Sequence, residues 1–225
     1  MPWRQLDDDV LLGQFPLRAF AIDFARNVTL LRLRDGRVLI HSTAPFSAQD
    51  VEVMRAFGEP CWLVEATRMH DTFARAGCAA LPDVPYLTPN ESLRGVAAHP
   101  LLPPPAAWDG EIDLLPLEGL RGTNEHVFFH RRSRTLVVAD SLFHFPAETR
   151  GWPRFFAQHV MRLPQLVGMS IFFRLMIRDR AAFEDSMRKV LAWDFDRIVP
   201  GHREPIQENA RDILRASLSS RGFNS

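Results

Sequence analysis

Two short apolar runs joined by a basic turn, between residues 125 and 144, constrain the fold of this chain more than any other stretch. The first run covers residues 127–129, the second covers residues 136–139, and the arginine-rich residues 131–134 lie between them. This pattern predicts a β-hairpin. Because both runs are almost continuous in apolar residues, they are typical of strands that are covered on both faces. We therefore expect the hairpin to belong to a sheet that is packed from both sides.

The second run ends on an acidic residue, Asp140. A carboxylate at the end of a buried strand costs free energy unless a partner compensates it, and the usual partners are a metal ion or a network of hydrogen bonds. A third interpretation is that Asp140 caps or turns the loop of residues 141–144. At this point the sequence leaves all three interpretations open.

The composition bounds the size of the fold and the choice of partners. A chain of 225 residues is long enough for one sizeable core, so we predict a single domain over residues 1–225. The 27 basic and 27 acidic residues balance, so no global positive charge favours nucleic acid or anionic lipid. Cys61 and Cys78 lack the spacing of a metal site, and residues 7–9 are acidic where a signal peptide needs an apolar core. These features predict a reduced, cytoplasmic setting.

The first half of the chain alternates strand and helix patterns, which indicates a mixed α/β fold. Short apolar runs bounded by turn residues predict strands at residues 20–24, 28–33, 38–41, 61–64, 85–87 and 111–117. Apolar residues at helical spacing predict helices at residues 47–57 and 71–80. Residues 88–110 are rich in proline, so we predict a long surface connection there.

The last third of the chain has a predominantly helical pattern. It predicts helices over residues 145–162, 164–174 and 180–193, a short strand over residues 197–202 and a closing helix over residues 204–218. The most apolar of these segments contains Arg174 and is shorter than the roughly 20 residues that a membrane span needs, so no span is predicted. Residues 145–193 carry more apolar side chains than one helix face can bury. We interpret them as a helical insert that covers a pocket or forms a homodimer interface.

Four polar side chains follow or end predicted strands, namely His70, His126, Asp140 and His202. Their order resembles that of the metallo-β-lactamase superfamily, in which strand ends supply a His-x-His-x-Asp-His cluster, then a histidine, an aspartate and a last histidine. The phrases LVVADS and IVPGH are similar to the aspartate and last-histidine motifs, and FFHRRSRTLVVADSLF and LAWDFDRIVPGH resemble a divergent branch of uncharacterised function. The resemblance implies a four-layer αββα sandwich with these four residues as metal ligands.

The first ligand cluster departs from the superfamily pattern. Where the superfamily has His-x-His-x-Asp-His, this chain reads Arg68-Met69-His70-Asp71-Thr72-Phe73, so only the second histidine is in place. A site for two metal ions is therefore not expected. A single zinc, or another divalent transition metal, could be held by His70, His126 and Asp140 with a water as the fourth ligand.

Two function classes follow from this arrangement. In the first, a metal-bound water attacks the carbonyl of a small ester, lactone, thioester or other anionic substrate, with His202 or Asp71 as acid or base. In the second, the protein is a catalytically degenerate, metal-free member that binds a ligand or a protein partner. Hydrogen bonds would then join His70 to Asp140 and Asp140 to His202. Arg68 would supply the cation in place of the metal and bind an anion.

Overall fold

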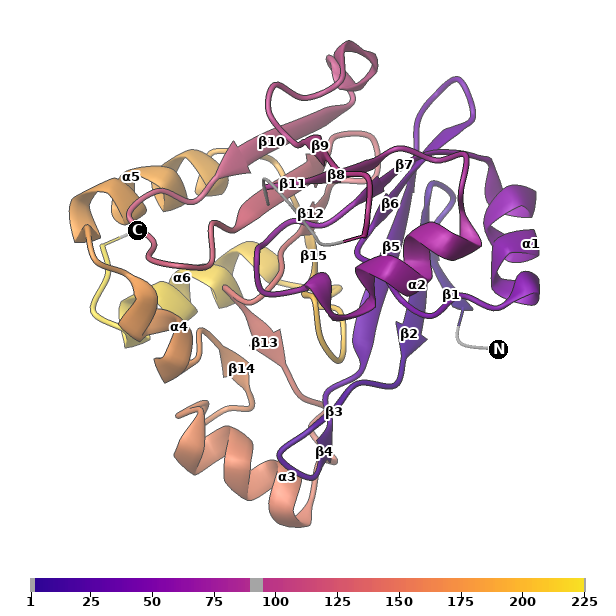
Figure 1. Cartoon of the computed structure of the whole chain (residues 1–225). Helices are drawn as coiled ribbons and strands as arrows, with labels where there is room; N and C mark the ends of the chain where they lie inside the picture. Colours follow the sequence, from indigo (N-terminus) through magenta and orange to yellow (C-terminus); the bar gives the residue numbers. More distant parts are fainter. Residues whose placement is uncertain (1–2, 90–94, 225) are drawn as a thin grey trace.

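The computed structural model describes residues 3–89 and 95–224, which form two packed β-sheets with helices on both outer faces (Figure 1). The first sheet has the strand order β1 (Trp3–Asp7), β2 (Val10–Phe15), β5 (Arg26–Arg32), β6 (Arg37–His41), β7 (Glu59–Val64), β8 (Tyr86–Thr88) and β9 (His99–Pro100). The second has the order β10 (Ile112–Pro116), β11 (His126–His130), β12 (Thr135–Val137) and β15 (Arg197–Val199).

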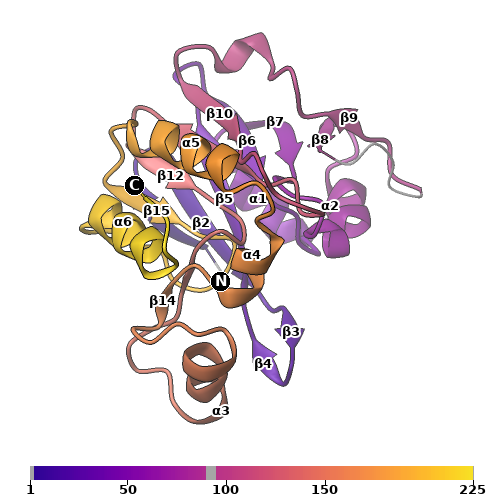
Figure 2. The ribbon, with the colours of Figure 1, turned by 90° about the vertical axis from the view of Figure 1, so that its left-hand side faces the viewer.

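Helices cover the outer face of each sheet. On the first sheet lie α1 (Ala48–Phe57) and α2 (Ala74–Ala80), and on the second lie α4 (Ile171–Met176), α5 (Arg180–Leu191) and α6 (Ala210–Ser220). Away from the sandwich lie the small hairpin of β3 (Arg18–Ala19) and β4 (Ile22–Asp23) and the helix α3 (Gly151–Phe155), which continues as a π-helical turn over Phe156–Val160 (Figure 2). A short ladder of β13 (Phe143–His144) and β14 (Val167–Gly168) connects this part to the second sheet.

The alternation of side chains along each strand separates the core into layers. In β5, Leu30 packs toward α1 and α2, whereas its neighbour Leu31 packs between the two sheets. In β11, Phe128 packs between the sheets and Phe129 packs against the helices on the other side. This confirms the αββα sandwich. It also explains the continuous apolar run in β11, because both faces of the strand are buried.

The predicted hairpin is present as β11 and β12, which pair antiparallel with Phe128 opposite Val137. The strand β12 also pairs in parallel with β15, through Val137 opposite Val199. This second pairing brings the ends of two strands that lie far apart in the sequence to the same edge of the sheet. Asp140 and His202 follow these two strand ends.

Several predicted element boundaries are wrong. Residues 145–162 were expected to be one helix, but β13 occupies the preceding residues and helix α3 begins only at Gly151. Residues 164–174 were also expected to be one helix, but they contain the strand β14. The helix α4 begins only at Ile171, because the side-chain oxygen of Ser170 caps it by accepting a hydrogen bond from the backbone N–H of Phe173. The closing helix begins at Ala210 and not at residue 204, since Ile206 first pairs with the strand β15.

The N-terminal strands β1 and β2 were not predicted, and only Ile22–Asp23 of the predicted strand at residues 20–24 is a strand. Phe20 and Ala21 have positive φ angles and form the turn of the β3–β4 hairpin. Residues 90–94 of the predicted proline-rich connection lie outside the described residues. Among the described helices, none combines the length and the apolar character that a membrane crossing requires.

Candidate metal centre

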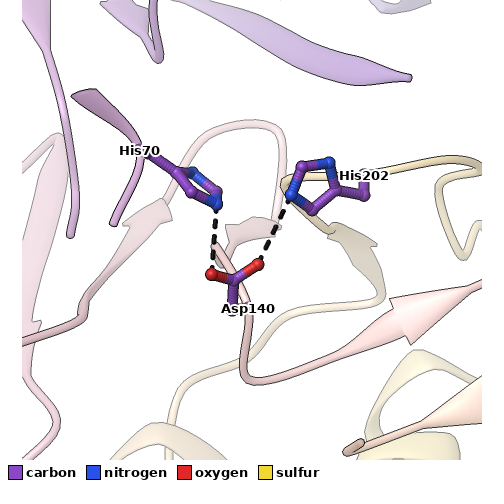
Figure 3. Close-up of side chains that lie close together, drawn as sticks. All are labelled: His70, Asp140 and His202. Carbon is purple, nitrogen blue, oxygen red and sulfur yellow. Dashed lines mark ion pairs between the residues drawn. The ribbon is translucent and has the colours of Figure 1, made fainter. Parts of the chain in front are cut away.

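Three side chains meet at one edge of the sandwich, each following a different strand (Figure 3). His70 follows β7, Asp140 follows β12 and His202 follows β15. His70 Nε2 lies 3.2 Å from Asp140 Oδ2, and His202 Nε2 lies 3.4 Å from Asp140 Oδ1. One potential ligand atom from each residue lies within 4.8 Å of the other two. We refer to these three residues as the His-Asp-His cluster.

A hydrogen bond fixes which nitrogen of His202 faces the carboxylate. Nδ1 of His202 lies 3.2 Å from the carbonyl oxygen of Ala25, and because a carbonyl oxygen only accepts, Nδ1 carries the hydrogen. In the neutral ring Nε2 is then an acceptor, and it faces another acceptor, Asp140 Oδ1. Two acceptors at this separation repel each other unless a cation lies between them. A metal ion or a second ring proton on His202 would supply that cation.

The nitrogen of His70 that faces Asp140 is also unpaired. His70 Nε2 is buried and makes no hydrogen bond of acceptable geometry, although it lies 3.2 Å from Asp140 Oδ2. Ligands of tetrahedral zinc lie about 2.0–2.2 Å from the ion, which places them about 3.4 Å from one another. The two nitrogen–oxygen separations of 3.2 Å and 3.4 Å match that spacing, although they run to different oxygens of Asp140. Two imidazoles and one carboxylate therefore fit one metal ion, with one coordination position left open.

The protonation states in the cluster suit metal binding. Burial, followed by the positive charge of Arg26, lowers the pKa of His70 to about 4. Burial by itself would raise the pKa of Asp140, but the charge interaction with His70, followed by the interactions with His202, outweighs it and holds that pKa well below its usual range. At neutral pH His70 is therefore neutral and Asp140 is ionised, which are the forms that ligate metals.

Glu125 holds the loop that carries Asp140. Its buried carboxylate accepts hydrogen bonds from the backbone N–H groups of Ala139 at 3.0 Å, Asp140 at 2.9 Å and Ser141 at 3.1 Å, and from the Ser141 hydroxyl at 2.6 Å. Burial, followed by the charge of Asp140, raises the pKa of Glu125 to about 7. Three consecutive backbone donors thus converge on one side chain, so Glu125 determines the position of the Asp140 backbone.

A second buried carboxylate, Glu65, lies behind His70. It accepts hydrogen bonds from the hydroxyls of Ser42 at 3.0 Å and Thr43 at 2.8 Å. Arg26 Nη1 lies 3.7 Å and His70 Nδ1 lies 3.8 Å from Glu65 Oε1. Burial raises the pKa of Glu65 to about 7, against the opposing effect of Arg26. The network holds the residue that directly follows β7, at the start of the loop that carries His70.

The turn that carries His202 is held by Asn27 and by close packing at Gly201. The Asn27 side-chain amide donates to the carbonyl oxygens of Pro200 and Arg203, each at 2.8 Å. A Cβ atom on Gly201 would lie 2.9 Å from the Ala139 carbonyl oxygen and 2.9 Å from His70 Cε1. Glycine is therefore required before His202 because the turn passes directly against His70.

The structure separates three other predicted site residues from the cluster. His126 is buried in β11, where Nδ1 lies 3.0 Å from the Asn124 carbonyl oxygen, and its ring borders a different cavity beside Thr88 and His99. Asp71 is exposed at the start of a 3₁₀ turn over Asp71–Phe73. Arg68 is exposed as well, and its backbone N–H donates to Thr123. None of these three belongs to the cluster of potential ligands found among the described residues.

The sequence interpretation missed the carboxylates that position the ligands. Glu65 directly follows a buried apolar strand, which is the same signal that pointed to Asp140. Glu125 directly precedes a buried apolar strand, and the sequence around it does not indicate its role. Its partners are backbone groups of a loop that begins 14 residues later. Asn27 lies inside β5, and its role depends on a turn 173 residues away.

Comparison with known proteins identifies the fold. No protein-family description and no curated protein sequence matches the chain. Among solved structures, a metallo-β-lactamase from Pontibacter korlensis is 11% identical with a TM-score of 0.64, and 99% of each chain is covered. One from Erythrobacter litoralis is 14% identical with a TM-score of 0.60, covering 98% of this chain and 91% of its own. The DIM-1 metallo-β-lactamase is 14% identical with a TM-score of 0.59, covering 97% and 96%. This chain therefore has the metallo-β-lactamase fold.

Proposed function

We propose that the protein is a hydrolase of a small ester, lactone or thioester that depends on one divalent transition metal. The observation that carries the proposal is the orientation of His202, whose Nε2 faces Asp140 as one acceptor facing another. The unpaired Nε2 of His70 is directed at the same carboxylate. The solved structures with this fold include metallo-β-lactamases, which are named for a hydrolysis that breaks a carbonyl–nitrogen bond.

His70, Asp140 and His202 would hold the metal, which when bound supplies a nucleophilic water at neutral pH and polarises the carbonyl group. Water adds to the carbonyl carbon, the bond to the alcohol or thiol breaks, and a proton of the water leaves with that group. Glu125 keeps Asp140 in place through the loop backbone during this reaction. The hydrogen bond to Ala25 keeps the ring of His202 in the tautomer that presents Nε2.

The test compares protein stripped of metal by a chelator with the same protein given one equivalent of zinc. We expect hydrolysis of p-nitrophenyl butyrate by the zinc-loaded protein, and no hydrolysis above background by the stripped protein or by Asp140→Ala. Asp71→Ala is the matched control, because Asp71 is an exposed aspartate outside the cluster. Equal hydrolysis with and without metal would contradict the proposal.

One observation favours a metal-free, ligand-binding member as the second candidate. The guanidinium group of Arg26 is buried and lies near the cluster, where its charge lowers the pKa of His70 and so disfavours further positive charge. In that case His202 would carry the second ring proton and pair directly with Asp140. Failure of the stripped protein to take up zinc at neutral pH would support this candidate over the hydrolase.

A further inference from the structure

An apolar cavity of about 230 Å³ opens directly beside the His-Asp-His cluster. Asp140 and His202 both line it. The other lining side chains come from the β3–β4 hairpin and the residue after it, from β13, from the segment after α3 and from the helix α4, and they include Phe24, Phe143, Phe156, Met161, Phe172 and Met176. Only one other polar side chain, Ser170, borders the cavity within the described part of the chain. The proposed metal centre is thus bounded by aromatic and methionine side chains.

Large apolar side chains are also exposed around the mouth of this cavity. Phe20 is 70% exposed and Phe172 is 49% exposed, and both line it. Trp152, which is 48% exposed, lies next to Phe20, and Phe155, which is 51% exposed, stacks on Trp152. The Trp152 indole donates a hydrogen bond to the Phe20 carbonyl oxygen, and the Phe20 ring stacks on Phe156 at 5.4 Å between ring centres. An exposed apolar patch that continues into an apolar cavity is typical of a ligand-binding surface.

The charge of the lining determines which ligands the cavity accepts. No arginine, lysine or other basic group except His202 borders it among the described residues, and the one acidic side chain in the lining is Asp140. A carboxylate or phosphate placed against the apolar walls, away from the His-Asp-His cluster, would lose its hydration without gaining a cationic partner. The lining therefore selects a neutral, apolar group.

The size of the cavity indicates that it takes only part of a substrate. Pockets that enclose a whole small-molecule ligand have volumes of about 300–1,000 Å³, and this cavity is smaller. We propose that it binds the neutral acyl chain of an ester or thioester, with the carbonyl group at Asp140 and His202 and the far end of a longer chain along Phe20 and Phe172. This assignment rests on the proposed hydrolase function, of which it specifies the substrate class.

Binding of unreactive analogues tests the assignment without relying on turnover. The probes are the neutral amides butanamide, hexanamide and octanamide, titrated into the zinc-loaded protein by calorimetry. We expect the affinity to rise by about fourfold for each methylene that enters the cavity, until the cavity is filled. Succinamic acid, which has the length of butanamide and a carboxylate at its far end, should bind at least about tenfold more weakly than butanamide, because its charge is desolvated without a partner.

Two residues of helix α4 provide a matched pair of variants. Phe172 and Leu175 are both exposed, at 49% and 64%, but only Phe172 lines the cavity. Phe172→Ser should weaken hexanamide binding by about fivefold, because roughly half of a phenylalanine side chain's contact area is lost. Leu175→Ser should leave it unchanged, and circular dichroism should show both variants folded.

Affinity that is independent of chain length, or equal weakening by the two variants, would overturn the acyl-chain assignment. Chain-length-dependent binding without any metal-dependent ester hydrolysis would leave the assignment of the cavity intact and overturn the hydrolase proposal. Metal-dependent hydrolysis that is equally fast for p-nitrophenyl acetate and p-nitrophenyl octanoate would leave the hydrolase proposal intact and overturn the acyl-chain assignment.

Discussion

The two walls of the proposed active site are built in different ways. The polar wall consists of His70, Asp140 and His202, which follow the ends of sheet strands. Hydrogen bonds to Glu125 hold the loop of Asp140, and hydrogen bonds from Asn27 hold the turn of His202. The apolar wall includes side chains on the β3–β4 hairpin, whose strands have two residues each, and on helix α4, which has 6 residues. Several of these side chains are half exposed. The difference suggests that the sheets position the reacting groups, while short peripheral elements determine which substrate fits.

The largest expected effect is on the polar wall, at Glu125. Glu125→Ala should lower the free energy of unfolding by about 3–5 kcal/mol, because three buried N–H groups lose their acceptor. Urea unfolding measures this loss. The exposed Glu118→Ala serves as control and should change stability by less than about 0.5 kcal/mol. A small effect of Glu125→Ala would show that the Asp140 loop does not depend on this side chain.

A smaller effect is expected where two of the ligand-bearing segments touch. Gly201→Ala places a methyl group 2.9 Å from the Ala139 carbonyl oxygen and from His70 Cε1. Overpacking of this kind costs about 1–3 kcal/mol, and the displaced His70 ring should weaken zinc binding about tenfold or more. Urea unfolding and competition with a zinc chelator measure the two effects. Unchanged zinc affinity would indicate that His70 does not ligate the metal.

The third prediction concerns pH and the histidine behind the polar wall. Burial, followed by the charges of His70 and Arg26, lowers the pKa of His41 to about 3. The unfolded chain binds a proton at His41 below about pH 6.5 that the folded protein does not bind, so this residue makes stability fall as the pH decreases. Between pH 7 and pH 5, His41→Gln should therefore lose less stability than the unmodified protein, by as much as about 2 kcal/mol.

Urea unfolding of the unmodified protein and of His41→Gln at pH 7 and pH 5 measures this difference in lost stability. Glu65 and Glu125 contribute in the opposite sense, because their pKa of about 7 in the folded state is above the usual value and their contribution to stability is lost as the pH rises through 7. Both proteins contain these glutamates, so the comparison isolates His41. Identical pH dependence of the two proteins would show that His41 takes up a proton in the folded state.

The smallest effect on stability is expected at the apolar wall. Phe172→Ala should lower the free energy of unfolding by less than about 1 kcal/mol, because the side chain is half exposed and contributes little to the core. The next residue, Phe173, is 1% exposed and belongs to the core between the second sheet and its helices. Thermal unfolding of the Phe172→Ala protein and of the unmodified protein measures the loss of stability. A large loss would mean that Phe172 supports the fold and not the ligand site.

Local patterns in the sequence predict the hairpin and a mixed α/β fold, and the resemblance to the metallo-β-lactamase superfamily implies the sandwich. The hairpin of β11 and β12 follows from two apolar runs and a turn, and both strands are buried on two faces as that pattern indicates. The starts of α3 at Gly151 and of α4 after Ser170 were predicted wrongly. Short helices and two-residue strands in this part of the chain are equally rich in apolar residues, so composition does not separate them. Helical spacing over so few residues does not distinguish the two.

For the site, strand ends in the sequence point to His70, Asp140 and His202, and the structure brings these three together. His126 shows the limit of that reasoning. It begins the strand β11, and a shift of one residue in a strand moves a side chain to the other face. Its backbone N–H is bonded to the Ala66 carbonyl oxygen, and its ring lies beside another cavity. Pairings between distant strands, which set this register, are not encoded in any local pattern.

Elemental analysis of protein purified without a chelator or an affinity tag tests the single metal centre most directly. We predict one equivalent of a divalent transition metal in the unmodified protein. His126→Ala should retain it, because His126 lies outside the cluster, and Asp140→Ala should contain none, because two histidines alone do not form the site. Two equivalents in the unmodified protein, none at all, or loss of the metal in His126→Ala would contradict the assignment of His70, Asp140 and His202 as a single metal centre.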